Sequence, residues 1–174
     1  MTTADVSVRV AWADDAAGIA EVQVRAWKET YVDLIPPMDA EAVAAAWHAS
    51  MSAPNDARNR VLVALERASV RGFAITQPSA DPDADPVNDG EIGELTVDPD
   101  HLREGHGSRL VHAAVDTLRA DRFSHARVWL TSTDDVRRAF LEEAGFAPDG
   151  AFRELDLRGD GEVIVKQVRL HAQL

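Results

Sequence analysis

The spacing of hydrophobic residues divides the first third of the chain into a strand and two helices. In residues 6–10 valines occupy every second position, which predicts a half-buried strand. Across residues 14–31 apolar residues recur every three or four positions, which predicts a helix that ends before Pro36. Residues 39–51 are rich in alanine and begin with Asp39, a residue type that caps helix N-termini, so a second helix is expected there.

The rest of the chain alternates between the same two patterns. Two strand-like runs, 60–66 and 70–76, lie close together and predict a β-hairpin. Several prolines and aspartates in residues 77–90 predict an exposed, mobile acidic loop. The later elements are expected as a strand at 91–98, a helix at 105–121, a strand at 126–131, a helix at 134–144 and strands at 146–158 and 162–170. This order predicts a single domain over residues 1–174, of the α/β or mixed α+β class, around one central sheet.

Charge and composition exclude several classes of function. The 174 residues carry a net charge of −12, so the surface repels phosphate backbones and no nucleic acid partner is expected. The chain has no cysteine, which removes disulfides, thiolate metal ligands and cysteine nucleophiles. No apolar run approaches the ~20 residues that cross a bilayer, and residues 1–5 lack the features of a signal peptide. We therefore expect a soluble cytoplasmic protein with no membrane partner, whose acidity would tolerate or attract a cationic substrate such as an amine.

A glycine-containing turn stands between a predicted strand and a predicted helix. The strand is closed by Pro99, and the sequence Gly105-His106-Gly107-Ser108 opens the helix. The first amides of a helix have no partner within it, and the helix dipole adds positive potential, so such a turn can bind a phosphate. A P-loop is excluded because its Gly-Lys-Ser/Thr is absent, and a dinucleotide fingerprint is excluded because Leu110 occupies the place of its third glycine.

Together with a later segment, this turn resembles the motifs of the GNAT superfamily, the GCN5-related N-acetyltransferases. That family has a strand ending in Val-x-Pro, a Gln/Arg-x-x-Gly-x-Gly/Ala turn, and later an Asn-x-x-Ala-x-x-Phe-Tyr-x-x-x-Gly-Phe helix. Here the strand ends in Val97-Asp98-Pro99, the turn follows, and residues 134–146 match the helix motif in part. The resemblance covers residues 91–146 and implies a central mixed, mostly antiparallel sheet of about seven strands flanked by about four helices.

The resemblance implies that acetyl-CoA (coenzyme A) binds along this strand and turn. Backbone groups of the strand would pair with the pantetheine arm, which would lie like an added strand beside residues 126–131. The amides of the turn would hold the pyrophosphate. The residues expected to bind the cofactor are Leu95, Thr96, Val97, Arg103, Glu104, Gly105, His106, Gly107, Ser108 and Asp134.

The implied reaction is direct attack on the acyl thioester by a primary amine of a small molecule or peptide. An ammonium group has no lone pair, so a base must remove a proton. Glu94 and Glu91 lie on the strand beside the cofactor and are the two candidates. In a regular strand they would point to opposite faces, so one of them is expected to face the cleft.

The chain departs from the family motifs at four positions. The tyrosine that follows Phe140 and protonates the departing thiolate in many members is Leu141 here, which leaves Tyr31, or Ser132 and Thr133, as candidate acids. The Gln or Arg of the turn is Leu102, the Asn of the helix motif is Asp134, and the Ala three residues later is Arg137.

These departures keep two alternatives open. One is a catalytically weak CoA-binding module used in sensing or regulation, and the other is an interaction protein that retains the fold. No metal site is expected, because the histidines lack zinc spacing and Pro86 breaks the calcium-loop pattern that Asp81 begins. The family leaves a homodimer open.

Overall fold

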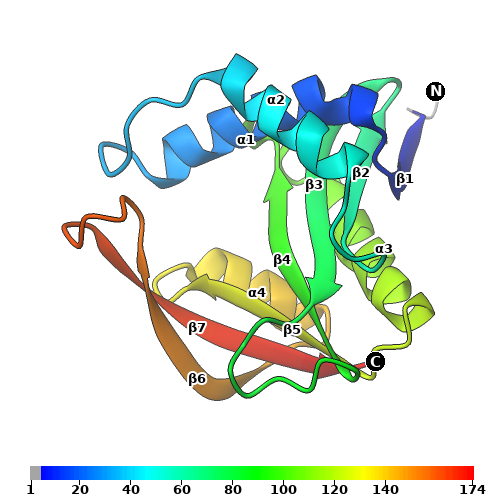
Figure 1. The fold of residues 1–174 in the computed structure, drawn as a ribbon, viewed down its shortest axis with the longest axis vertical. Coiled ribbons are helices and arrows are strands. Elements are labelled where there is room, and N and C mark those ends of the chain that lie inside the picture. Colours follow the sequence, from blue (N-terminus) through cyan, green and yellow to red (C-terminus); the bar gives the residue numbers. More distant parts are fainter. Residues whose placement is uncertain (1–4) are drawn as a thin grey trace.

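The structure is a computed structural model that describes residues 5–174. The described chain forms seven strands and four α-helices around one sheet (Figure 1). In chain order these are β1 (Val6–Val10), α1 (Ala16–Thr30), α2 (Ala40–Ser52), β2 (Arg60–Glu66), β3 (Ser69–Pro78), β4 (Asp89–Val97), α3 (His106–Ala120), β5 (His125–Thr131), α4 (Asp135–Glu143), β6 (Ala147–Asp156) and β7 (Ile164–Gln173). Short 3-10 turns precede α1 (Ala13–Asp15) and follow β4 (Pro99–His101).

The sheet has the strand order β1-β2-β3-β4-β5-β7-β6. Every neighbouring pair is antiparallel except β4 and β5, which run parallel. A parallel pair needs a crossover, and here α3 provides it. The mixed, mostly antiparallel sheet of the expected fold class is therefore confirmed, and so are the expected helices and strands, with ends that differ by a few residues.

Two apolar cores lie on opposite faces of the sheet. One core joins α3 and α4 to the sheet through the buried side chains of Leu110, Leu118, Leu141, Leu62 and Ile92. The other joins α1 and α2 to the opposite face through Ile19, Val22, Val63 and Phe73. Figure 1 shows α1 and α2 above β2–β4, while β5, β6 and β7 swing away below and leave their face on this side without a helix.

The loop between β3 and β4 lies at the surface, as its composition predicts, but two of its aspartates are held by side chains of the sheet. The Asp81 side chain is only 6% exposed and accepts hydrogen bonds from the Trp129 indole at 3.0 Å and from Arg169 at 2.9 Å. Asp83 pairs with Arg127 and Arg169, each at 2.8 Å. The prediction of an exposed acidic loop is confirmed for most of residues 80–88, whereas the side chain of Asp81 is buried because the arginines that bind it come from distant strands.

None of the helices within residues 5–174 is long and apolar enough to span a membrane.

Candidate functional site

The parallel strands β4 and β5 separate part-way along their length. They are paired only from Asp89 to Ile92 on β4 and from His125 to Val128 on β5. Beyond this point β4 continues to Val97 against β3, and β5 continues to Thr131 against β7. Within residues 5–174 no strand pairs with the inner edges of β4 and β5 past that point. The sheet therefore contains a wedge with one unpaired edge on each side.

The unpaired edge of β4 leads into a turn whose backbone amides are free. The amide of Arg109 donates to the carbonyl of Gly105 at 3.1 Å, as the first regular bond of α3. For residues 103–108, which we call the amide turn, no hydrogen bond from a backbone amide to any described protein group is found. Gly105 has φ 86°, a left-handed conformation that glycine adopts without strain, and this bends the chain into the helix.

Positive charge and open space adjoin the amide turn. Arg103 and Arg109 are exposed, and neither forms an ion pair with a described residue. A Cβ added at Gly107 would lie 3.5 Å from both Phe140 and Val97, an ordinary contact distance, so the backbone here is not covered tightly. A cavity of 180 Å³ opens beside the turn between α3 and α4, lined by Ser108, His112, Phe140 and Glu143 among others.

An ion pair that the sequence did not reveal fixes the start of this segment. The Asp98 carboxylate is 1% exposed and accepts from Arg25 of α1 at 2.7 Å and from the amide of Asp100 at 3.1 Å. Burial alone would raise the pKa of Asp98, but these hydrogen bonds outweigh it and hold the pKa below its ordinary value. Because the two partners are far apart in the sequence, no local pattern marks this contact.

A β-bulge changes the direction of the two candidate base residues. Gly93 has no partner on β3, since Ile75 pairs with Glu94 and Thr76 with Ile92. Ile92 and Leu95 therefore both point into the core under α3, although three positions separate them. Glu91 and Glu94 consequently share the opposite face, and the expectation that they point to opposite faces was wrong.

Glu94 lies beyond the bulge, beside α1. Its Oε1 accepts a hydrogen bond from the hydroxyl of Thr96 at 2.7 Å and one from the indole of Trp27 at 3.3 Å. No donor to its Oε2 is found among the described side chains and amides. One carboxylate oxygen is thus fixed by the protein and the other is free.

Glu91 lies where β4 and β5 are still paired, opposite Arg127, and it is only 7% exposed. Burial raises the pKa of Glu91, and the nearby negative charge of Asp81 raises it further. The loop that contains Asp81 covers this carboxyl group. The carboxylates of Glu91 and Glu94 therefore differ in how accessible they are, although both lie on the same face of the sheet.

Tyr31 follows α1 and stands next to the same cluster. Its ring packs edge-on against Trp27, with 5.6 Å between ring centres. Burial raises the pKa of Tyr31, and the neighbouring Glu94 raises it further, so the phenol keeps its proton at neutral pH. Arg137 and Asp134 of the α4 N-terminus are close enough to act on the same pKa.

A comparison with protein-family models decides the family. Residues 19–146 match the model of the acetyltransferase (GNAT) family. The chain belongs to the GNAT family. No curated protein sequence gives a significant match.

Solved structures with the GNAT fold resemble the chain over nearly its whole length. The Salmonella typhimurium protein yncA, solved with acetyl-CoA, has a TM-score of 0.73 at 19% identity, and the match covers 98% of this chain and 94% of that one. PaiA N-acetyltransferase from Thermoplasma acidophilum, solved with coenzyme A, has a TM-score of 0.69 at 16% identity, with 98% and 99% covered. A ribosomal-protein-alanine N-acetyltransferase from Brucella melitensis has a TM-score of 0.75 at 16% identity, with 97% and 99% covered.

The structure shows where the residues that depart from the GNAT motifs lie. Leu141, at the position of the family's tyrosine, is fully buried in the core under α4. Asp134 is the N-cap of α4, and its carboxylate accepts from the amide of Arg137 at 3.0 Å. Leu102 is exposed. The side chain of His106, one of the residues expected to bind the cofactor, points into the protein and is 1% exposed, so only its backbone is available at the turn.

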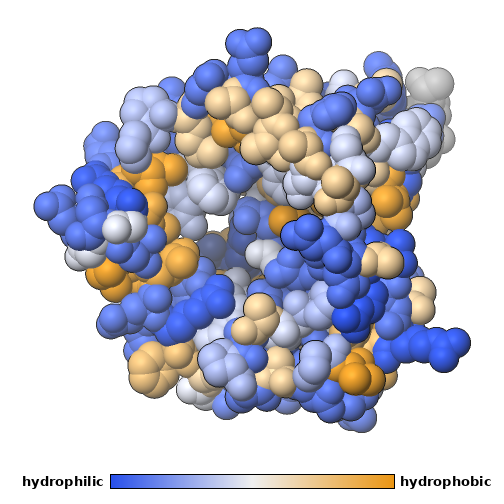
Figure 2. All heavy atoms as spheres, viewed as in Figure 1, coloured by the Kyte–Doolittle hydropathy of each residue, from blue (hydrophilic) through white to orange (hydrophobic). Residues whose placement is uncertain are grey.

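The C-terminal hairpin reaches across to the N-terminal helices of this GNAT chain. Arg158, just after β6, donates to the carbonyl of Leu34 at 2.6 Å, in the segment that joins α1 to α2. Figure 2 shows the molecule hollowed at its centre, between this crossing and the sheet. No local pattern in the sequence indicates this contact, since it joins exposed groups of two segments that are far apart in the chain.

Proposed function

We propose that the chain is an acetyl-CoA-dependent N-acetyltransferase that acetylates a primary amine of a small molecule or peptide by direct attack. The observation that carries the proposal is the continuous path from Glu94, along the unpaired edge of β4, to the free amides of the amide turn. A carboxylate, an open strand edge and a phosphate-binding turn follow one another in the order that an extended thioester would need.

The residues of the wedge fit coenzyme A in shape and charge. The free amides from Arg103 to Ser108 would hold the diphosphate, aided by Arg103 and Arg109. Backbone groups of Leu95, Thr96 and Val97 would pair with the pantetheine arm where no strand does. Bound acetyl-CoA would supply an acetyl group on a thiolate leaving group.

Glu94 is the proposed general base. Its Oε1 is held by Thr96 and Trp27, which leaves Oε2 free to accept a proton from an ammonium group or from a water molecule. Glu91 is disfavoured in this role because the loop covers it, although its raised pKa would make it a stronger base.

Tyr31 is the proposed acid for the departing thiolate. Its raised pKa keeps the phenol protonated, and its neighbours are Glu94 and the start of α4. A thiolate has an ordinary pKa of about 8.5 and can leave without full protonation, so this proton supports the reaction without being essential to it. Tyr31→Phe should therefore lower kcat only about tenfold and shift the alkaline side of its pH profile. An unchanged rate and profile would remove Tyr31 from the mechanism.

The experiment that tests the proposal measures thiol release from acetyl-CoA with a panel of primary amines. Glu94→Gln should lower kcat/KM at least about 100-fold while CoA binding stays unchanged, because glutamine can still accept from Thr96 and Trp27 but cannot take a proton. Glu91→Gln is the matched control and should change the rate far less. If both variants keep the wild-type rate, neither glutamate is the base.

Buried Leu141 favours the alternative of a CoA-binding module with little turnover. The same panel separates the two functions. CoA binding without turnover of any amine would support the module, and absence of CoA-dependent thermal stabilisation would contradict both functions and leave an interaction protein.

A further inference from the structure

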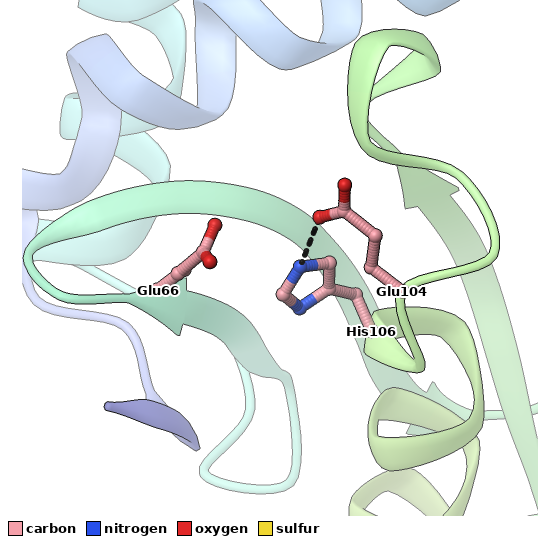
Figure 3. A group of neighbouring side chains, drawn as sticks. All are labelled: Glu66, Glu104 and His106. Atoms are coloured by element: carbon pink, nitrogen blue, oxygen red, sulfur yellow. Dashed lines mark ion pairs between the residues drawn. The ribbon is translucent and has the colours of Figure 1, made fainter. Parts of the chain in front are cut away.

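Three side chains from two segments meet behind the amide turn. Glu66 ends β2, Glu104 belongs to the turn, and His106 is the first residue of α3. One ligand-type atom of each lies within 4.8 Å of the other two. Figure 3 shows the His106 ring between the two carboxylates, with Glu66 on one side and Glu104 on the other.

His106 is buried without a hydrogen-bond partner. Its side chain is 1% exposed, and neither ring nitrogen forms a hydrogen bond within the described chain. The Oε2 atom of Glu104 lies 3.4 Å from its Nε2, but the geometry of this contact misses a hydrogen bond. Buried polar groups are nearly always paired, so a buried imidazole that faces two carboxylates without a hydrogen bond is suited to bind a ligand there.

The geometry points to a binding site for a divalent transition-metal cation, held by Glu66, Glu104 and His106. A neutral imidazole with two carboxylates is a donor set that suits Zn²⁺ and balances its charge, whereas Mg²⁺ and Ca²⁺ prefer oxygen ligands alone.

The distances agree with such a site. In a tetrahedral zinc site with bonds of about 2.0–2.1 Å, two ligand atoms are about 3.3 Å apart. The Glu104 and His106 atoms are already 3.4 Å apart. Glu66 must move inward by a small rotation, which its partly exposed side chain permits, and water can complete the coordination.

Two neighbouring groups compete with the metal for the carboxylates. Arg71 donates to Oε2 of Glu66 at 3.1 Å, and the His101 ring contacts Oε2 of Glu104 at 3.1 Å. Glu66 has a second oxygen, and Oε2 of Glu104 has a second lone pair beside its contact with His101, so neither contact has to break for a metal to bind. The sequence could not indicate this site, because spacing rules search one segment and these ligands come from two.

The metal would join the amide turn to the β2–β3 hairpin. Glu104 and His106 flank Gly105, so a metal bound to both would restrict the turn that we propose for the diphosphate. An effect of the metal on CoA affinity therefore rests on the proposed function, whereas the site itself does not.

The test is calorimetric titration of the metal-free full-length protein with Zn²⁺ in the absence of CoA. One equivalent should bind and raise Tm, and Co²⁺ should give the visible absorption of a four-coordinate site. Mg²⁺ should do neither. Because outer-shell partners alone are worth about 10–100-fold in metal affinity, His106→Gln and Glu104→Gln should each weaken Zn²⁺ binding by at least about 100-fold.

Two choices of variant keep the test decisive. Glu104 is half-exposed, so Glu104→Gln removes a ligand without disturbing the core if His106→Gln fails to fold. His48 is an exposed histidine on α2, and His48→Gln should bind Zn²⁺ like the wild type. No saturable Zn²⁺ binding, or equal binding by Glu104→Gln and the wild type, would overturn the site whether or not the protein binds CoA.

Discussion

The two loops that flank β4 use their polar groups in opposite ways. In the loop before the strand, Asp81 and Asp83 are bound by Arg127, Arg169 and the Trp129 indole. In the turn after it, backbone amides have no acceptor and the arginines have no acidic partner within the described residues. Both loops are polar in sequence, yet one is closed by the protein itself and the other is open.

This difference distinguishes polar groups that the protein pairs with one another from polar groups that are available to a ligand. A buried charge must be paired or it destabilises the fold, so the Asp81 network has to be complete. Free amides at the surface destabilise the fold little, because water forms hydrogen bonds with them. They remain able to bind an anion. We therefore place the proposed binding site where unpaired polar groups lie beside an unpaired strand edge, and not where the composition is acidic or basic.

Gly107→Asp is the change with the largest expected effect on the open turn. A carboxylate would stand among the amides where we place the diphosphate, so CoA binding should weaken at least about 100-fold, or ~2.7 kcal/mol. Tm should change little, because the new Cβ meets Phe140 and Val97 only at 3.5 Å. Titration calorimetry with CoA and a thermal melt measure the two quantities.

The control for this prediction adds the same charge elsewhere. Val87 is 68% exposed in the loop before β4, and Val87→Asp should bind CoA normally. Gly105→Asp would be a less specific test, since φ 86° would strain any other residue and the fold itself could change. Normal CoA binding by Gly107→Asp would mean that the turn does not hold the diphosphate.

Asp81→Ala is the corresponding change in the closed loop. It removes the hydrogen bonds that Asp81 accepts from Arg127, Arg169 and the Trp129 indole, so the free energy of unfolding should fall by about 3 kcal/mol. Both arginines keep other acidic partners, so neither charge is left unpaired. For a chain of this size that corresponds to a fall in Tm of roughly 9 °C. CoA affinity should not change. Asp83 is at an exposed position, so Asp83→Asn should lower the free energy of unfolding less. A larger fall for Asp83→Asn than for Asp81→Ala would show that Asp83 is the main partner of the arginines.

The sequence predicted what is decided locally. Alternation in β1, the helical stripe of α3 and the Asp39 cap each follow from a few neighbouring residues, and all are present in the structure. The amide turn was also predictable, because a proline, a short loop and two glycines lie close together in the chain.

What the sequence could not predict depends on contacts between distant segments. Arg25 with Asp98, Arg169 with Asp81, and His106 with Glu66 join residues that no spacing rule connects. The bulge at Gly93 reversed the expected faces of Glu91 and Glu94, since a single unpaired residue shifts the alternation of a strand. The roles of Glu91, Glu94 and Tyr31 remain predictions.

Glu91→Gln should have the smallest effect of these changes. It tests whether Glu91 belongs with the closed loop before β4 or with the proposed site. Burial, and then Asp81, raise the pKa of Glu91 in the folded protein, whereas the unfolded chain has a pKa near about 4.3. Below that pH Glu91 is protonated in both the folded and the unfolded state, so it does not lower the free energy of unfolding. As pH rises through the interval up to the folded pKa, the unfolded state releases its proton first, so wild-type stability falls.

The glutamine side chain of the variant cannot ionise, so the variant does not lose this stability as pH rises. Urea unfolding should show Glu91→Gln to be more stable than the wild type near neutral pH, with the difference vanishing as pH falls below about 4. Acid-sensitive pairs such as Asp149 with Arg169 weaken in both proteins, so they cancel from the difference. A variant that is less stable at neutral pH would show that the ionised carboxylate is well paired, and Glu91 would then belong wholly to the closed network rather than to the site.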